Sequence, residues 1–257
     1  MKKILIISFL IGALMFAGWL VCTEHIYVVP ILAYHHIDKE IHKDSPTVLA
    51  ENFQMQMKYI YDRGYNVITV DELINSINKD IKLPRNSVVI TIDDGYDDNY
   101  IYAYPFFKKY NFPATIFIIT KWLEKEGYLS WDQILEMSQN NIAFGAHTRT
   151  HAYLPEIKDS QLYDEILGSK LDIQARLKKE AKYFCYPIGG FSDKIIQHVR
   201  AAGYGGAFTT NRGEGRFNKN IFALKRIKMT NSDTNVFRMW GKLSGFYNLF
   251  REEKSPY

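Results

Sequence analysis

Two adjacent carboxylates end an apolar stretch of the sequence and are its clearest candidates for chemistry. The stretch 88–92 is rich in β-branched residues, the pattern of a buried parallel strand, and Asp93 and Asp94 follow it directly. Aspartates are poor strand residues, so both should lie where the strand opens into a loop. Two neighbouring acids repel each other and differ in environment, so one can bind a cation while the other accepts a proton. An ordinary strand-end turn with solvated acids is the alternative.

Two histidines, His147 and His151, form a second candidate cluster. Their spacing of four residues would place both on one face of a helical turn, from which they can hold one metal ion. The strand-like run 142–144 comes just before them, so His147 should lie at the end of a strand, as Asp94 does. Two histidines and one carboxylate leave coordination positions open, which is typical of a catalytic metal site. A solvent-facing histidine pair is the alternative.

The sequence around these residues predicts strands that alternate with helices. The sequence predicts strands near 28–33, 66–69, 88–92, 114–119, 142–144, 183–186, 206–209 and 222–227. It predicts helices near 50–63, 71–77, 96–110 with a break at Pro105, 131–138 behind a capping box at Ser130, 160–179 and 193–202. Such alternation indicates one α/β domain with a parallel sheet, whose active residues gather at the carboxyl ends of strands. The pattern alone does not separate a barrel from an open, doubly wound sheet.

Composition and the N-terminal sequence limit the class of protein and its location. The 257 residues suit one sizeable domain, and 47% hydrophobic residues exclude a disordered chain. A net charge of +4 without a basic stripe gives no reason to expect nucleic-acid binding. Residues 4–22 carry no charge and follow Lys2 and Lys3, so residues 1–25 are expected to be a membrane anchor and 26–257 an exported domain. A cleaved signal peptide, which would make the protein secreted, is the alternative.

With both clusters in view, the chain resembles the polysaccharide deacetylases of the NodB-homology family. Residues 91–95 match the family's T-F-D-D-G motif, and residues 147–151 match its H-[ST]-x-x-H motif. The resemblance spans roughly residues 28–230 and implies a distorted, incomplete (β/α) barrel. It also implies that Asp94, His147 and His151 hold a divalent metal, expected to be zinc, and that Asp93 is the catalytic base.

Three further segments bear on the resemblance. Residues 184–189 are similar to a subgroup with F-x-Y-P-x-G, which includes deacetylases of β-1,6-linked N-acetylglucosamine polymers, and Cys185 stands where other members have arginine. Pro187 and Gly189 could fix the backbone so that the Ile188 N–H points at a developing oxyanion, with substrate contacts from Tyr186 and Pro187. A plain strand-end turn is the alternative. Arg226 stands where many members have the histidine that protonates the leaving group.

Arginine is a poor proton donor, so His35 is the candidate acid, and Arg226 becomes a candidate substrate contact. His36 should point away from the site if the strand continues, because strand side chains alternate. A packed or solvated histidine is the alternative role for either. The C-terminal run 237–250 is aromatic and basic, and we expect a helix that packs on the barrel, with contact to a membrane surface as the alternative.

The expected function is metal-dependent removal of N-acetyl groups from an amino-sugar polymer outside the cytoplasmic membrane. The first alternative is an O-acetyl esterase acting on xylan-like polymers, since the same machinery cleaves esters. The second is a catalytically weak protein that binds wall polymers, suggested by the departures at Cys185 and Arg226. The sequence does not decide the polymer, the metal or the oligomeric state.

Overall fold

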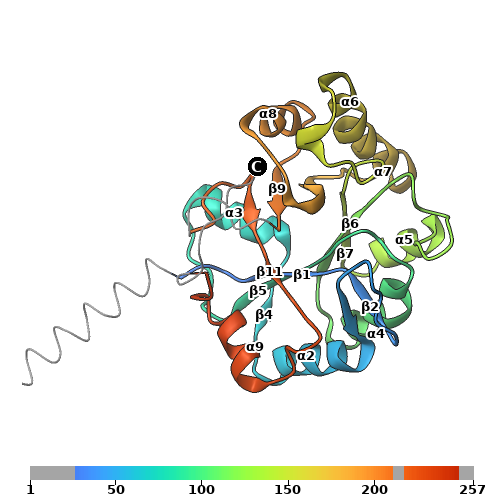
Figure 1. The fold of residues 1–257 in the computed structure, drawn as a ribbon. Coiled ribbons are helices and arrows are strands. Elements are labelled where there is room, and N and C mark those ends of the chain that lie inside the picture. The colour runs from blue at the N-terminus through green and yellow to red at the C-terminus, as the bar shows by residue number, and fades with distance from the viewer. Residues whose placement is uncertain (1–26, 211–216, 249–257) are drawn as a thin grey trace, which may run out of the picture.

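A computed structural model describes residues 27–210 and 217–248 of the chain as a barrel of parallel strands surrounded by helices (Figure 1). The strands are β1 (Ile31–Tyr34), β2 (His36–Asp38), β3 (Thr47–Leu49), β4 (Asn66–Val67), β5 (Ser87–Ile92), β6 (Ala114–Ile118), β7 (Ile142–Ala146), β8 (Tyr183–Cys185), β9 (Gly206–Thr209), β10 (Leu224–Lys225) and β11 (Ile227–Lys228). The expected distorted, incomplete (β/α) barrel is confirmed, since the pairs between neighbouring strands are parallel.

The main sheet is curved into a barrel, and its two edge strands are consecutive in the sequence. Its order is β10-β9-β8-β7-β6-β5-β1-β11, with β4 added beside β5. The two ends of this order, β10 and β11, are consecutive in sequence and are separated by Arg226 alone. The expected single strand over 222–227 is therefore two short strands, because the chain leaves one edge of the sheet and joins the other. Arg226 therefore lies at the junction between the two edges of the sheet, which we call the seam of the barrel.

Helices follow most of the strands and cover the outside of the barrel. They are α2 (Ala50–Asp62), α3 (Val70–Lys79), α4 (Tyr104–Tyr110), α5 (Trp131–Ser138), α6 (Asp159–Tyr163), α7 (Ser169–Leu177), α8 (Asp193–Ala201) and α9 (Val236–Leu243). The predicted capping box is confirmed, since the Ser130 hydroxyl accepts from the Gln133 N–H while the Gln133 side chain accepts from the Ser130 N–H. Helix α3 also begins with a capping box, formed by Thr69 and Glu72, so it starts one residue before the expected position 71.

Two predicted helices contain π-helical turns. The turn η1 (Asn99–Ala103) leads directly into α4, and Pro105 is the second residue of that helix, so the expected break takes the form of a change from π-helix to α-helix next to this proline. The turn η3 (Asp164–Gly168) joins α6 to α7 within the helix expected over 160–179. Such bulges are frequent at functional sites, and both of these carry side chains that support the candidate site.

Alternation along the strands separates a packed interior from an outer core. Ile31, Val89 and Cys185 point into the barrel with Phe117, Phe208 and Leu224, and α3 packs across the same cluster through Leu73 and Ile74. The residues between them face the surrounding helices and belong to the larger core. Because the side-chain period of a strand is two, the inward series on β1 and β5 continue to a polar residue at the strand end. On β5 this series runs through Val89 and Thr91 to Asp93.

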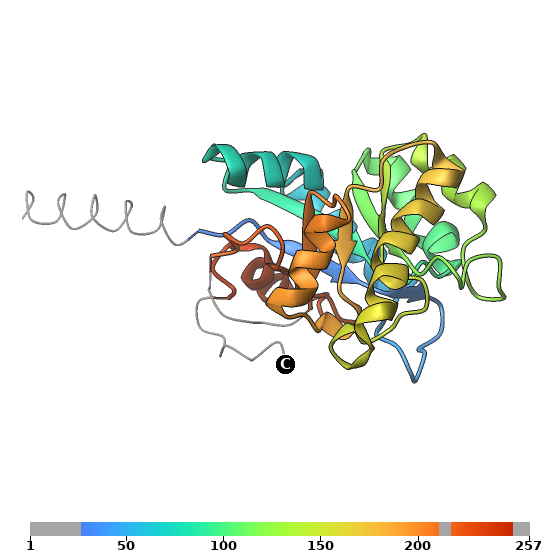
Figure 2. The same cartoon turned by 90° about the horizontal axis from the view of Figure 1, so that it is seen from above.

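Both views show α3 and α9 on the side from which β1 begins, with α5 and α7 on the opposite side (Figures 1 and 2). Helix α9 packs through Met239 and Leu243 and exposes Phe237 and Trp240, so the C-terminal run forms a packed helix, but this helix ends at Leu243. The expected anchor at residues 1–25 lies outside the described residues. Within 27–210 and 217–248, none of the helices has the length and apolarity to span a bilayer.

Candidate active site

A cavity of about 330 Å³ opens at the carboxyl end of the barrel strands. The predicted residues Asp93, Asp94, His147, His151, His35, Tyr186 and Ile188 all line it, together with Asp44, Ser45, Pro46, Tyr96, Trp122 and Thr210. The predicted residues come from four separate parts of the sequence and meet at one point, as expected for a parallel barrel. The sequence analysis missed Tyr96 and Trp122, which line the cavity as aromatic walls.

Asp94, His147 and His151 bring three potential ligand atoms together. Oδ1 of Asp94 lies 3.4 Å from Nε2 of His147 and 3.5 Å from Nε2 of His151. This oxygen is buried and has no hydrogen-bond partner among the described residues, which is costly unless a cation or another group completes its coordination. The donor set fits a divalent ion such as zinc with positions left open.

Protonation and tautomer at these three residues also suit metal binding. Burial lowers the pKa of His147 to about 3 and lowers the pKa of His151, so both rings are neutral near pH 7. Nδ1 of His147 donates to the Cys185 carbonyl at 2.8 Å, which leaves the Nε2 lone pair directed at Asp94. Burial, and then the charge of Asp93, raise the pKa of Asp94 to about 7, and a bound cation would keep this carboxylate ionised.

The two histidines do not lie on a helical turn, so that part of the sequence prediction was wrong. The chain leaves β7 and forms an irregular loop in which Thr148 and His151 have φ values of 63° and 62°. Glu165 on η3 holds this loop by accepting from the Arg149 N–H at 2.8 Å and the Thr150 N–H at 3.0 Å. The histidines converge because of this loop geometry rather than because of helical periodicity.

A second acid on the same helical unit fixes the Arg149 side chain. Asp172 accepts from Nε of Arg149 at 2.8 Å and from Nη2 at 2.6 Å. The guanidinium passes over Gly168, where a β-carbon would lie only 2.7 Å from Nε. The sequence analysis did not single out Glu165, Gly168 or Asp172, and their only signal was polar residues on one side of a predicted helix.

Asp93 is bound on both oxygens by Arg226. Nη1 of Arg226 lies 2.7 Å from Oδ1 and Nη2 lies 2.6 Å from Oδ2, and both side chains are almost fully buried. Nη1 also donates to the Thr91 hydroxyl at 3.0 Å, and Nη2 lies 3.1 Å from Sγ of Cys185. Burial raises the pKa of Asp93, but the Arg226 guanidinium outweighs burial and holds this pKa well below its usual range.

This pairing corrects the expectation that Arg226 contacts substrate. Its side chain has no solvent exposure, because it lies beneath Asp93 in the barrel interior. The family's arginine position holds Cys185, and the Arg226 guanidinium reaches the Cys185 thiol from a different strand. Arg226, at the position where many members have a histidine, thus supplies the positive charge that the family's arginine would provide at position 185.

His35 lies next to Asp93, whereas its neighbour His36 points away. Nε2 of His35 is 3.8 Å from Oδ2 of Asp93, and Nδ1 is buried without a hydrogen-bond partner among the described residues. Burial lowers the pKa of His35 to about 4 against the opposing effect of Asp93, so its resting form is neutral. Nδ1 of His36 instead pairs with Asp98 at 2.5 Å, as the predicted alternation requires.

Ile188, on the turn that follows Pro187, lines the cavity. Ile188 has a φ of 58°, an uncommon conformation for a β-branched residue, and its side chain is 67% exposed. Strained residues of this kind gather at ligand sites. Tyr186 lines the cavity, but its hydroxyl donates to the Phe222 carbonyl at 2.9 Å, and Pro187 is buried.

Two other groups of ligating side chains fit a metal less well. Asp93, His147 and Cys185 cluster closely, but Arg226 already occupies both Asp93 oxygens, and burial raises the pKa of the Cys185 thiol. His36 and His42 stack face to face, with ring centroids 3.8 Å apart and planes 3° apart. Nitrogen lone pairs lie in the ring plane, so stacked rings do not direct them at one ion.

Comparison with known proteins agrees with this fold and site. The sequence pattern of the family described as polysaccharide deacetylase matches residues 80–207. The Bacillus subtilis protein YxkH, whose name assigns it to the polysaccharide deacetylases, is 32% identical over 81% of this chain and 74% of its own length. A poly-β-1,6-N-acetyl-D-glucosamine N-deacetylase of Staphylococcus aureus is 27% identical over 78% of this chain and 73% of its own.

A solved structure supports the same assignment. The deacetylase PplD of Streptococcus pyogenes, determined in complex with acetate, superposes with a TM-score of 0.74 at 26% identity. The superposition covers 79% of this chain and 93% of that one. Fold and site together define a parallel α/β barrel enzyme with a candidate metal centre at the carboxyl ends of its strands. The chain belongs to the polysaccharide deacetylase family.

Proposed function

We propose that this protein removes N-acetyl groups from an extracellular polymer of the N-acetylglucosamine type, using a divalent metal, expected to be zinc. The observation that carries this proposal is the buried, unpartnered Oδ1 of Asp94, which faces Nε2 of both His147 and His151 beside the paired base Asp93. The similarity to a poly-β-1,6-N-acetyl-D-glucosamine N-deacetylase supports the substrate class.

Asp94, His147 and His151 would hold the metal at the floor of the cavity. A divalent ion there supplies Lewis acidity toward the acetyl carbonyl and lowers the pKa of the attacking water. Asp93 accepts the proton of that water, because its carboxylate lies beside the ligands and Arg226 fixes its orientation. The Ile188 N–H is the proposed donor to the oxyanion, since the turn at Ile188 faces the cavity.

His35 is the proposed acid that protonates the departing amine. Because its resting form is neutral, it must first receive a proton, and Asp93 is the nearest source, with 3.8 Å between Oδ2 and Nε2. One proton can then pass from water to Asp93, from Asp93 to His35, and from His35 to the amine nitrogen. This sequence returns both side chains to their starting charge when the products leave.

The neutral resting state of His35 also favours a second candidate, hydrolysis of O-acetyl esters on xylan-like polymers. An alkoxide leaves with less help from an acid than an amine does. The third possibility, a wall-polymer-binding protein with little activity, has less support, because the Asp93–Arg226 pair beside three ligands serves no purpose in a binder.

Acetate release from a small panel of polymers separates these functions. N-acetylglucosamine oligomers with β-1,6 and β-1,4 linkages are compared with acetylated xylan, each with the metal-loaded full chain and with the same chain after chelation. Release from the amino-sugar oligomers that chelation abolishes supports the proposal. Release from xylan alone would assign the esterase, and binding of the oligomers without acetate release would leave a binding protein.

The proposed location is the outer face of the cytoplasmic membrane, with residues 1–25 as a single-pass anchor. The support is the uncharged run 4–22 behind Lys2 and Lys3. Protease digestion of intact spheroplasts tests this proposal, since an anchored outer domain is degraded while the chain sediments with membranes. A chain found only in the medium would indicate cleavage and secretion.

A further inference from the structure

A second cavity, larger than the catalytic one, lies at the opposite end of the barrel. Its volume is about 590 Å³, within the range of ligand pockets. Ile31 and Leu224, the first residues of β1 and β10, line it together with the C-terminal end of α3. Since helices run back against the strands, this is the amino end of the barrel, and the catalytic residues lie at the other end.

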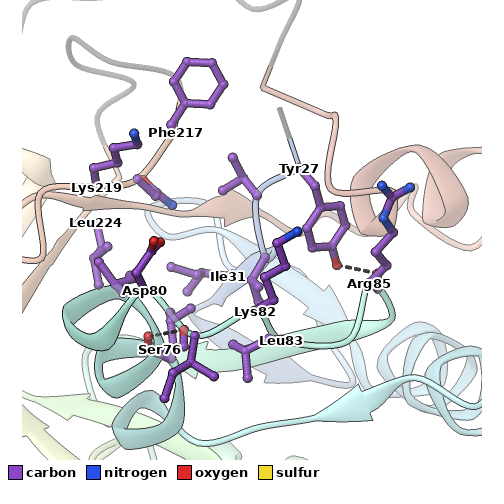
Figure 3. A pocket seen from close by; sticks show the side chains of 16 residues that line it. Tyr27, Ile31, Ser76, Asp80, Lys82, Leu83, Arg85, Phe217, Lys219 and Leu224 are labelled. Carbon is purple, nitrogen blue, oxygen red and sulfur yellow. Dashed lines mark hydrogen bonds between the residues drawn. The ribbon is translucent and has the colours of Figure 1, made fainter. Parts of the chain in front are cut away.

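The walls of this cavity combine an apolar floor with a basic rim. Ile31, Leu73 and Leu224 belong to the buried interior cluster and form the floor. The charged lining residues are the three basic side chains of Lys82, Arg85 and Lys219 and one acidic side chain, that of Asp80. Figure 3 shows Lys219 and Phe217 across the cavity from Tyr27 and Arg85, with Lys82 between them.

Two large apolar side chains at this cavity remain open to solvent. Ile81 is 56% exposed and Phe217 is 42% exposed. Apolar side chains beside lysine and arginine are the combination by which proteins contact a membrane interface. A ligand that matches these walls has an anionic head and an apolar body.

The covalent connection of the chain places this cavity near the apolar N-terminal run. Tyr27 lines the cavity, and its hydroxyl donates to the Arg85 carbonyl. Only five residue steps separate Tyr27 from Cys22, the last residue of the uncharged run, so the distance is at most about 18 Å. If that run spans the bilayer, as the proposed location requires, the cavity cannot lie far from the lipid surface.

We infer that this cavity is a docking site for an anionic phospholipid of the membrane that anchors the protein. The inference rests on the proposed membrane attachment. The lipid phosphate would lie among Lys82, Arg85 and Lys219, with its glycerol and upper acyl carbons over the apolar floor. Docking at the amino end of the barrel directs the catalytic cavity away from the bilayer, toward polymer outside it.

The test uses the full chain reconstituted in nanodiscs of phosphatidylcholine alone or of phosphatidylcholine with phosphatidylglycerol. An environment-sensitive fluorophore is attached at Ile81→Cys, or at Tyr163→Cys on α6 as the control, since Tyr163 is 66% exposed near the catalytic end. We expect a blue-shifted emission at position 81 only in discs that contain phosphatidylglycerol, and no shift at position 163. The variant Lys82→Glu/Arg85→Glu should lose the shift, and the matched surface variant Lys121→Glu/Lys125→Glu should keep it.

Each other result contradicts the inference in a different way. A shift in both kinds of disc would show apolar contact without a site for an anionic head. Co-elution with discs without any shift would show that the cavity does not meet lipid, and something else covers it. A chain that co-elutes with neither kind of disc would refute the membrane attachment itself, and the docking site with it. Acetate release from soluble oligomers should be unchanged by Lys82→Glu/Arg85→Glu, so the deacetylase proposal stands apart from these outcomes.

Discussion

The guanidinium of Arg226 binds both carboxylate oxygens of Asp93, at 2.7 and 2.6 Å, inside the barrel. The pair is nearly inaccessible to solvent, so neither charge can lose its partner without a large cost. Asp93 is thereby held ionised and in one orientation, with its pKa well below the usual range because Arg226 outweighs burial. This ion pair accounts for two departures from the family pattern, at Cys185 and at Arg226.

We expect Arg226→His to destabilise the fold by about 3–5 kcal/mol and to abolish acetate release, because it leaves a buried carboxylate without its cation. Cys185→Arg alone should also destabilise the fold, since two guanidinium groups would crowd one carboxylate. The double variant Cys185→Arg/Arg226→His places the family's arginine at position 185 and its histidine at position 226, and it should recover stability and part of the activity. Denaturant unfolding and acetate release measure both effects. A double variant no better than the worse single variant would contradict the idea that Arg226 replaces the family's arginine.

The two neighbouring aspartates should fail in different ways. Asp93→Asn should keep the metal and lose turnover by about 100- to 10,000-fold, the usual contribution of a general base. Asp94→Asn should instead lose metal affinity, as should His147→Ala, whereas His198→Ala on α8 serves as a control. Elemental analysis and acetate release distinguish the roles, with circular dichroism to confirm folding. The opposite pattern would exchange the roles of the two acids.

Glu165 should support the metal site without touching the metal. Its carboxylate accepts from the N–H groups of Arg149 and Thr150, so it fixes the loop that carries both histidines. We expect Glu165→Leu to weaken metal affinity by about 10- to 100-fold, the range found when outer supports of metal ligands are removed. Competition with a fluorescent chelator measures this loss. An unchanged affinity would show that the loop keeps its shape without Glu165.

The leaving group should reveal the role of His35. His35→Ala is expected to slow release from an N-acetyl oligomer by about 100-fold or more, since an amine must be protonated to depart. Hydrolysis of an activated aryl acetate should change little, because its leaving group needs no proton. His42→Ala is the matched control, on the stacked pair outside the cavity. Equal losses on both substrates would assign His35 to structure, and no loss on either would remove it from the mechanism.

Burial of neutral His35 should also make stability depend on pH. Its pKa is lowered by burial to about 4 in the fold and is near 6.5 when unfolded, so between these values the unfolded chain binds the extra proton. Stability from this group therefore falls as the pH drops from 6.5 toward 4, by up to about 3 kcal/mol. Denaturant unfolding of the chelated protein at pH 7 and pH 4.5 should show a smaller difference for His35→Gln than for the wild type. An equal difference in both proteins would place the titration elsewhere.

Much of the site was predictable because strand alternation is local. Val89, Thr91 and Asp93 share one side of β5, and the inward series on β1 ends at His35. The run of apolar residues locates each strand, and the polar residue at its end then falls at the mouth of the barrel. Asp94, His147 and His35 were expected near one another because each follows a strand, whereas His151 was placed by a helical turn that does not form, and all four line the cavity.

The remaining features depend on contacts between distant segments. The helical turn expected for His147 and His151 does not form, because the hydrogen bonds that Glu165 accepts and the partly buried Arg149–Asp172 pair favour an irregular loop. The direction of Arg226 follows from its place between β10 and β11, which only the closed sheet defines. A short sequence window contains neither Asp93 nor the closed sheet, so Arg226 was expected to contact substrate.

The ion pair at the seam of the barrel forms only when the last strands of the chain are in place. Asp93 and the three proposed ligands are all present by residue 151, but the cation that balances Asp93 arrives only at residue 226, where the last strand returns to the first. During synthesis, a chain that has been made only as far as β9 carries Asp93 and the proposed ligands without the cation that balances the charge of Asp93. Catalytic competence and full assembly therefore arise in the same event, and a chain cut short before the seam would be inert rather than prematurely active.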